Sequence, residues 1–121
     1  MDKISETIDY LTKKFKRALY GMRKRAEKKG YSCEMTFDTL RDLFIEQEAK
    51  CFYSGKTFDF NDPMKRPSVD RVDNSLGYVA GNVVWCCFGV NSLKSSRTYP
   101  ELISICKTLV VHNPDWKMVN G

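Results

Sequence analysis

The sequence predicts an α+β fold in which N-terminal helices precede a central β-hairpin with its own short helix, and one more helix follows. Three observations support this order. Apolar residues recur every three or four positions near the N-terminus, two β-rich segments flank a run of turn formers, and a helix-capping pattern begins at Thr98. With 121 residues, the chain is expected to form a single domain, residues 1–121, with a modest core.

The first helix is predicted over Ile4–Lys28, where the apolar stripe leaves a basic outer face. Gly30 should end it, because glycine readily adopts the left-handed conformation of a helix C-terminus. A second helix is predicted from the N-cap Thr36 to about Ala49, which completes a basic helical region over residues 1–50. Its inward-facing residues are expected to be Leu40, Leu43, Phe44 and Gln47.

The central region, residues 51–97, should begin with a short strand and turn at Cys51–Gly55 and a loop at Phe58–Lys65. Two strands are then predicted at Ser68–Val72 and Val83–Trp85, because β-branched residues there flank the turn-rich run 73–77.

A short helix should follow from Cys86 to about Ser95. Helical spacing places Cys87, Asn91 and Lys94 on one face of it, and Cys86, Val90 and Leu93 on a second face that we expect to be buried.

The last helix is predicted over residues 98–112, with Thr98 as its cap and Pro100 in its first turn. Its inward-facing residues are expected to be Leu102, Ile105, Cys106 and Leu109. The remaining segment, Asn113–Gly121, is expected to be irregular.

Charge is concentrated near the N-terminus. Residues 1–30 contain ten basic and four acidic residues, whereas the whole chain carries a net charge of +5, so the other residues sum to −1. A basic segment on a near-neutral body is typical of proteins that bind polyanions such as nucleic acid. The alternative is a solvated helix face without a partner.

Other features exclude several protein classes. We expect neither a membrane segment nor a secretory signal, because the chain has no long apolar run and its N-terminus is polar. A cytoplasmic protein is therefore expected, in the host cell if a phage encodes it. The five cysteines are odd in number and include no Cys-x-x-Cys pair, which argues against a disulfide framework.

The most informative segment contains Ser68-Val69-Asp70-Arg71-Val72-Asp73, then Gly77-Tyr78, Gly81-Asn82-Val83 and Asn91-Ser92-Leu93-Lys94. Over residues 51–97 this order resembles the ββα-metal finger, or His-Me finger, of HNH-type endonucleases such as small phage, homing and restriction enzymes. The chain matches a variant in which arginine replaces the usual histidine.

The resemblance implies a DNA endonuclease that depends on Mg²⁺ or Mn²⁺ and hydrolyses, or nicks, the phosphodiester backbone. It implies catalytic roles for Asp70, Arg71, Asn82 and Asn91, with Asp70 and Asn91 as the metal ligands and Asn82 holding the catalytic loop. The alternative is a DNA-binding module that keeps the finger but cleaves weakly or not at all. Either protein is expected to act as a monomer or homodimer.

Arg71 distinguishes the two alternatives, because arginine cannot accept a proton as histidine would. Its guanidinium can instead bind phosphate oxygens in a bidentate manner. Some arginine-type relatives use a tyrosine as nucleophile, for which Tyr20 and Tyr53 are candidates, although both are also suited to core packing. Asp70 and Arg71 would point to opposite faces of a regular strand, so the strand must end or distort there if both serve one site.

Structural zinc is not expected. Cys51-Phe52-Tyr53-Ser54 and Cys87-Phe88-Gly89-Val90 resemble two zinc-binding pairs that have each lost one cysteine. Phe52, Phe88 and Trp85 are expected to brace the finger instead.

The one histidine, His112, is expected at a helix C-terminus without a catalytic role. Phosphate contacts are expected from Lys13, Lys16, Arg17, Lys24 and Lys94.

Overall fold

The structure, a computed structural model, describes residues 3–118. It confirms the α+β fold. In chain order the elements are helices α1 (Lys3–Lys29) and α2 (Phe37–Glu46), strands β1 (Pro67–Arg71) and β2 (Val83–Cys87), helices α3 (Phe88–Lys94) and α4 (Tyr99–His112), and a 3-10 turn at Trp116–Met118.

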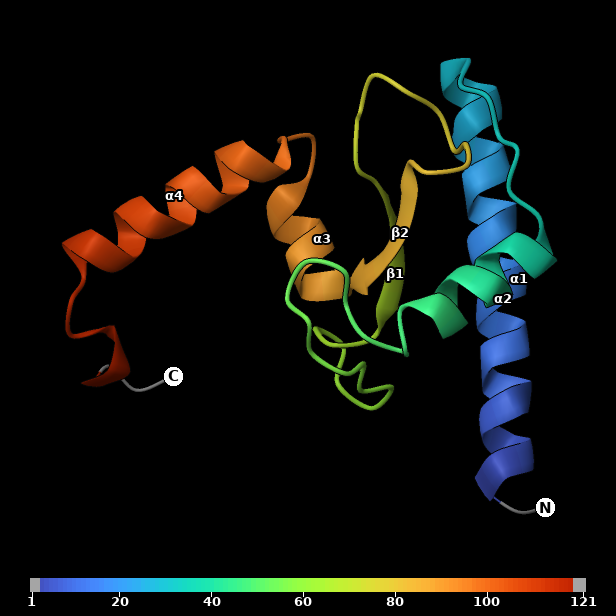
Figure 1. The fold of residues 1–121 in the computed structure, drawn as a ribbon, viewed down its shortest axis with the longest axis horizontal. Coiled ribbons are helices and arrows are strands. Elements are labelled where there is room, and N and C mark those ends of the chain that lie inside the picture. The colour runs from blue at the N-terminus through green and yellow to red at the C-terminus, as the bar shows by residue number, and fades with distance from the viewer. Residues whose placement is uncertain (1–2, 119–121) are drawn as a thin grey trace.

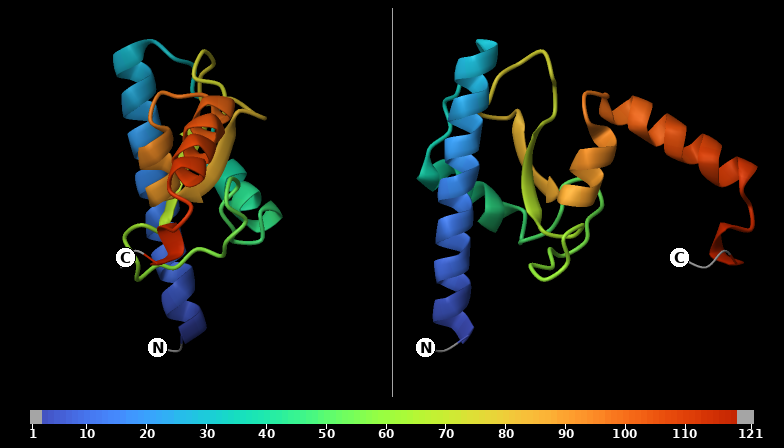
Figure 2. Two further views of the ribbon diagram at one scale, coloured as in Figure 1. Left: turned by 90° about the vertical axis from the view of Figure 1, so that its left-hand side faces the viewer. Right: turned by 180° about the vertical axis from the view of Figure 1, so that it is seen from behind.

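The antiparallel hairpin of β1 and β2 stands between two helical layers (Figure 1). Helices α1 and α2 cover one side, and α3 lies on the other. Helix α4 leads away from α3 and from the rest of the domain, as the views from the side and from behind also show (Figure 2). The hairpin and α3 are therefore the elements that can bring residues from the central region together.

Trp85 lies at the centre of the core and is fully buried. Its indole N–H donates to the Leu40 carbonyl at 3.0 Å, and its ring contacts those of Phe15 and Phe44, with centroids 5.3 and 5.7 Å away. One side chain of β2 thus joins α1 and α2 to the hairpin.

Helix α1 buries Phe15, Met22 and Ala26 along one stripe, as its sequence period predicts. It ends at Gly30, whose φ of 75° is the predicted left-handed conformation. Ile8 is exposed, because this end of α1 extends past the hairpin (Figure 1).

Thr36 and Thr98 cap their helices as predicted. The Thr36 side chain accepts from the Thr39 N–H, and the Thr98 side chain accepts from the Glu101 N–H, in capping boxes. Helix α2 ends at Glu46, earlier than expected, because Glu48 and Ala49 have positive φ angles and turn the chain toward β2.

Three local predictions are wrong. Residues 51–55 form turns rather than a strand, with only an isolated bridge between Lys50 and Thr57. Strand β2 continues to Cys87, so α3 starts at Phe88 instead of Cys86. In α4, Leu102 is buried, but the other predicted inward residues are not: Cys106 is exposed, as are Ile105 and Leu109 at 44% and 58%. Helix α4 points away from the core against which they would pack.

The described residues contain no helix with both the length and the apolar character needed to cross a membrane.

Gln47, just after α2, binds the backbone of Trp85 through both ends of its amide. Its Oε1 accepts from the Trp85 N–H at 2.9 Å, and its Nε2 donates to the Trp85 carbonyl at 2.8 Å. The Trp85 carbonyl also accepts from the Phe52 N–H. Gln47 therefore connects α2 to β2 by hydrogen bonds rather than by apolar packing.

Replacing Gln47 tests this connection. Gln47→Ala should lower the free energy of unfolding by about 1–3 kcal/mol, because it leaves a part-buried Trp85 N–H without its partner. Gln47→Glu keeps the acceptor for that N–H and should cost less. Urea unfolding measures both variants, and equal stability of Gln47→Ala and the parent would contradict this role.

Candidate active site

The loop between the strands is held by Asn82, which is buried. Its Oδ1 accepts from the Asp73 N–H at 2.8 Å, and its Nδ2 donates to the Asp73 carbonyl at 3.0 Å and the Gly77 carbonyl at 2.9 Å. Asn82 thus supports the loop through three backbone groups, which agrees with the loop-holding role expected for it.

The same loop is also anchored to the connection between α1 and α2. Gly77 approaches Ser32 so closely that a Cβ there would lie 2.4 Å from the Ser32 carbonyl oxygen. The Tyr78 N–H donates to that oxygen, and the Tyr78 carbonyl accepts from the Glu34 N–H. Only glycine fits at position 77, and this approach places Tyr78 beside α1.

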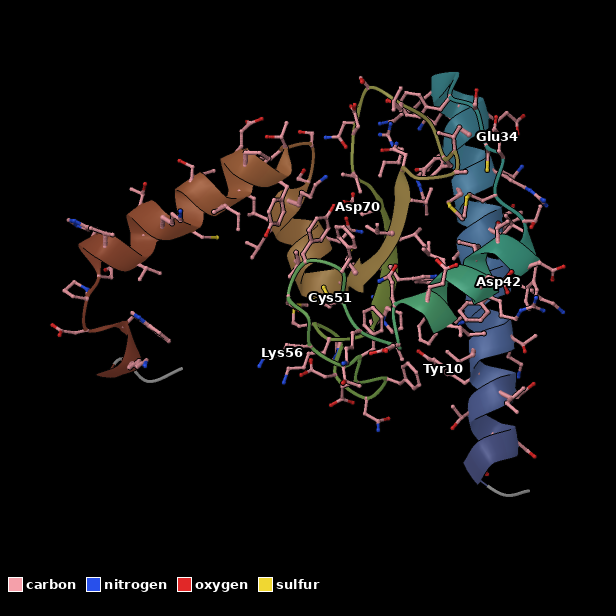
Figure 3. The ribbon with its side chains drawn as sticks, in the orientation of Figure 1. Tyr10, Glu34, Asp42, Cys51, Lys56 and Asp70 are labelled. Atoms are coloured by element: carbon pink, nitrogen blue, oxygen red, sulfur yellow. The ribbon has the colours of Figure 1, made fainter. Side chains whose placement is uncertain are left out.

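Asp70 belongs to β1, and its buried side chain lies between β1 and α3 (Figure 3). Its Oδ2 accepts from the Tyr53 hydroxyl at 2.6 Å and lies 3.1 Å from the Lys94 ammonium. Lys94 is fully buried, and its Nζ also donates to the Arg71 carbonyl at 3.2 Å. The carboxylate therefore joins β1, α3 and the segment before β1.

The prediction that Lys94 contacts phosphate is wrong. Lys94 instead turns toward β1, where Asp70 neutralises its buried charge. Leu93, predicted to be buried, is 62% exposed instead. The faces of this helix are thus rotated relative to the prediction.

Tyr53 holds its proton firmly. Burial, the hydrogen bond to Asp70 and the negative charge of Asp70 together raise the pKa of Tyr53 far above its ordinary value. Its ring stacks on Tyr99 with centroids 5.2 Å apart. Tyr53 is therefore a hydrogen-bond donor that orients Asp70, and the geometry does not favour it as a nucleophile.

Tyr20, the other candidate nucleophile, lies outside the site. Its side chain is 66% exposed, which also excludes core packing, and the Lys24 ammonium lies 5.5 Å from its ring centroid. It does not line the pocket that contains Asp70.

Asn91 faces β1 from α3. Its Nδ2 donates to the Ser68 hydroxyl at 2.9 Å and to the Val69 carbonyl at 3.2 Å. These two bonds fix the orientation of the carboxamide and leave its oxygen available for another partner.

Arg71 is the last residue of β1, and its side chain reaches the loop that follows. Its Nη1 donates to the carbonyls of Asn74 and Leu76 at 2.8 and 2.7 Å, and its guanidinium lies 4.1 Å from the ring centroid of Tyr31. Because the strand ends here, Arg71 and Asp70 can both line one pocket despite being adjacent in sequence.

That pocket has a volume of about 320 Å³. It is lined by Arg25, Ser68, Val69, Asp70, Arg71, Asn74, Tyr78, Asn91 and Ser95. Three of the four predicted catalytic residues are thus brought together, and the fourth, Asn82, supports the loop beside them.

Sequence reasoning missed Arg25, which enters the pocket from α1. Its Nε donates to the Tyr78 hydroxyl at 2.9 Å. Its guanidinium folds over Gly21, where a Cβ would lie 3.0 Å from Arg25 Nη1. A glycine inside a helix is unfavourable unless a neighbouring group needs the space. Gly21 was therefore the feature of the sequence that could have indicated a side chain packed against this turn of α1.

Two oxygens of the site remain open. Both contacts of Asp70 involve Oδ2, and no donor among the described residues contacts Asp70 Oδ1 or the Asn91 carboxamide oxygen. No buried side-chain oxygen or nitrogen in that part of the chain lacks a partner, so both atoms must reach solvent. Both residues line the pocket, which therefore offers a carboxylate and a carboxamide oxygen.

These oxygens suit a hard divalent cation that keeps most of its waters. Residues 3–118 contain no group of three or more His, Cys, Asp or Glu side chains that could hold a metal. A cation in this pocket would therefore depend on Asp70, a carboxamide, water and a bound anion.

Cys51 and Cys87 are free thiols near the start of α3. The Cys51 sulfur accepts from the Ser54 N–H at 3.4 Å. Burial acts to raise the pKa of Cys51, but hydrogen bonds from Ser54 and from the Cys87 and Tyr53 backbone outweigh it and lower this pKa. Phe52, expected to brace the finger, is 55% exposed, whereas Trp85 is buried in the core.

The remaining predicted residues lie elsewhere. Lys13, Lys16, Arg17 and Lys24 are all exposed on α1, and Lys13 pairs with Asp9 at 3.1 Å. His112 is the last residue of α4, outside the pocket.

Comparison with known proteins finds a relative in a phage. A 29.0 kDa protein from the dda-modA intergenic region of Enterobacteria phage T4, itself described as uncharacterized, is 31% identical over 91 residues. The match covers 75% of this chain but 36% of the phage protein, so the chain spans about a third of that relative's length. No family model and no solved structure matches the chain.

Proposed function

We propose that the chain is a divalent-metal-dependent DNA endonuclease of the HNH type, which hydrolyses or nicks the phosphodiester backbone. The observation that carries this proposal is the pair of open oxygens, from Asp70 on β1 and Asn91 on α3, in one pocket with two arginines. The finger-like order of two strands and a helix, and the relative in phage T4, are consistent with it.

Asp70 and Asn91 would hold a Mg²⁺ or Mn²⁺ ion, whose chemistry is to polarise the scissile phosphate and stabilise the leaving oxygen. Tyr53 orients the Asp70 carboxylate by donating to Oδ2, so that Oδ1 stays directed to the pocket. Asn91 is oriented in the same way by its bonds to Ser68 and Val69.

Arg71 and Arg25 supply permanent positive charge. One nitrogen of each guanidinium is bound to the protein, Nη1 in Arg71 and Nε in Arg25, and the others have no hydrogen-bond partner among residues 3–118. These free N–H groups suit phosphate oxygens, on which charge builds up while water attacks phosphorus and the bond to the leaving sugar oxygen breaks. Neither arginine can accept the proton that the attacking water releases, so this proton passes to solvent, and the leaving sugar oxygen takes a proton from solvent to become a hydroxyl.

A DNA-binding module without cleavage is the second candidate. The Lys94 ammonium, 3.1 Å from Asp70, already neutralises much of the charge that would attract a cation. A plasmid-nicking assay with Mg²⁺ or Mn²⁺ separates the candidates, because only the endonuclease converts supercoiled DNA to the open-circular form.

Asp70→Asn should abolish cleavage, because it removes the carboxylate that would bind the cation. It also leaves Lys94 buried without a counter-charge, which should destabilise the fold by about 3–5 kcal/mol. The double variant Asp70→Asn/Lys94→Met removes that charge, and should be folded yet inactive. Asp62→Asn, in the loop before β1, should nick at the parental rate. Parental nicking by the folded double variant would show that the site is assigned wrongly.

Arg71→Ala should slow cleavage about 100-fold or more, the cost of losing one transition-state donor. Arg71→Lys should restore only part of the rate, because an ammonium cannot form the two-pronged contact. Arg23→Ala, which removes an exposed arginine from α1, is the matched control. Single-turnover rates at saturating metal measure all three, and a full rate in Arg71→Ala would argue against the charge role.

Tyr53→Phe tests whether a tyrosine takes part in the chemistry. We expect cleavage to persist, because Tyr53 keeps its proton. Its raised pKa stabilises the folded state below about pH 10, and this contribution is lost as pH rises further, when the unfolded chain ionises first. Urea unfolding at alkaline pH should therefore show a shallower loss of stability in Tyr53→Phe, by up to about 1.4 kcal/mol per pH unit. Complete loss of cleavage in this variant would contradict this expectation and show that the Tyr53 hydroxyl is essential.

A further inference from the structure

One flank of α1 carries basic side chains beside the hairpin, where they line a pocket while Arg17 and Arg25 remain exposed to solvent. Lys14, Arg17 and Arg25 line a second pocket of about 190 Å³ together with Ser68, Val69 and Trp85. Positions 14, 17, 21 and 25 are three or four residues apart, so they share one side of the helix. Lys13, Lys16 and Lys24 are the outward lysines of α1: Lys13 and Lys24 lie next to Arg17 on the helix, but none of the three lines this pocket.

The two pockets are continuous along β1. Arg25, Ser68 and Val69 line both the second pocket and the candidate active site. A molecule bound along this flank of α1 would therefore lead directly to Asp70 and Arg71.

A fourth cation joins this flank from the segment before β1. Arg66 lies with its guanidinium 4.6 Å from the ring centroid of Phe88. Burial, followed by the charges of Arg66 and Arg17, lowers the pKa of Lys14. The charges of Arg66 and Arg17 thus both act on Lys14.

No ion pair in the described part of the chain offsets this repulsion. None of its six ion pairs includes Lys14, Arg17, Arg25 or Arg66. By contrast, Lys13 on the outward side is paired with Asp9. Unpaired cations held together beside a groove are stabilised by a bound polyanion.

We propose that the flank formed by Lys14, Arg17, Arg25 and Arg66 binds the phosphate backbone of duplex DNA and guides it into the Asp70 pocket. The outward lysines of α1 contribute little. This inference rests on the proposed function for its ligand, DNA. The sequence alone predicted that DNA contacts the outer side of α1. The proposed binding surface lies instead between α1 and β1.

The test compares two triple variants that remove the same charge. Lys14→Gln/Arg17→Gln/Arg66→Gln removes the flank, while Arg25 is kept because it also lines the active-site pocket. Lys13→Gln/Lys16→Gln/Lys24→Gln removes three outward lysines. Circular dichroism and thermal melting establish that each variant is folded. Binding to a short fluorescein-labelled DNA duplex is followed by anisotropy in EDTA, over a series of KCl concentrations, so that cleavage plays no part.

The flank variant should bind at least about tenfold more weakly at moderate salt. Its slope of log affinity against log salt should fall by about 0.9 for each phosphate that the variant no longer binds. The outward variant should change the parental slope by less than about 0.9, the equivalent of one phosphate. Equal effects of the two variants, a larger effect of the outward variant, or a parent that does not bind the duplex would each overturn the proposal.

The proposed cleavage activity is judged separately, by nicking with Mg²⁺. A parent that binds through the flank but does not nick would uphold this inference and reject the endonuclease. A parent that nicks DNA, together with unchanged binding in the flank variant, would support the endonuclease and reject the proposed flank.

Discussion

The buried ion pair between Lys94 and Asp70 is the interaction on which the arrangement of the central region depends. A fully buried ammonium must have partners, and Lys94 finds two on adjacent residues, the Asp70 carboxylate and the Arg71 carbonyl. These contacts set how α3 sits on β1, and so where Asn91 lies. With the Tyr53 hydroxyl on the same carboxylate oxygen, three separate segments converge on Asp70.

This constraint also defines what the site can bind. The ion pair occupies one oxygen of Asp70 and leaves the other facing a pocket with Arg25 and Arg71. The pocket thus combines one partly neutralised acid with two unpaired guanidinium groups. With more positive than negative charge, this pocket favours a metal ion that arrives bound to an anion, such as Mg²⁺ on a phosphate, over a metal ion alone.

Local sequence signals predicted the features that depend on few neighbours. The caps at Thr36 and Thr98, the end of α1 at Gly30 and the hairpin could be predicted, because each reflects backbone chemistry within a short stretch of sequence. The loop role of Asn82 was expected only from the resemblance to the ββα-metal finger. The position of Lys94 could not be predicted in either way, because its burial depends on Asp70, 24 positions earlier in the chain. Arg25 was missed for the same reason: its pocket is made by β1. Helix α4 was misjudged because an apolar stripe does not reveal whether a core lies beside it.

Side-chain amides and an ammonium also satisfy the outward-facing backbone of the hairpin on both sides. Gln47 covers Trp85 on β2, while Asn91 and Lys94 cover the carbonyls of Val69 and Arg71 on β1. A two-stranded sheet normally presents two free edges on which a strand from another molecule can grow. Here side chains already bind some of these groups on each edge, and a side chain cannot continue the ladder. Those positions are therefore closed to a further strand, and Asn91, which closes one of them, also lines the pocket.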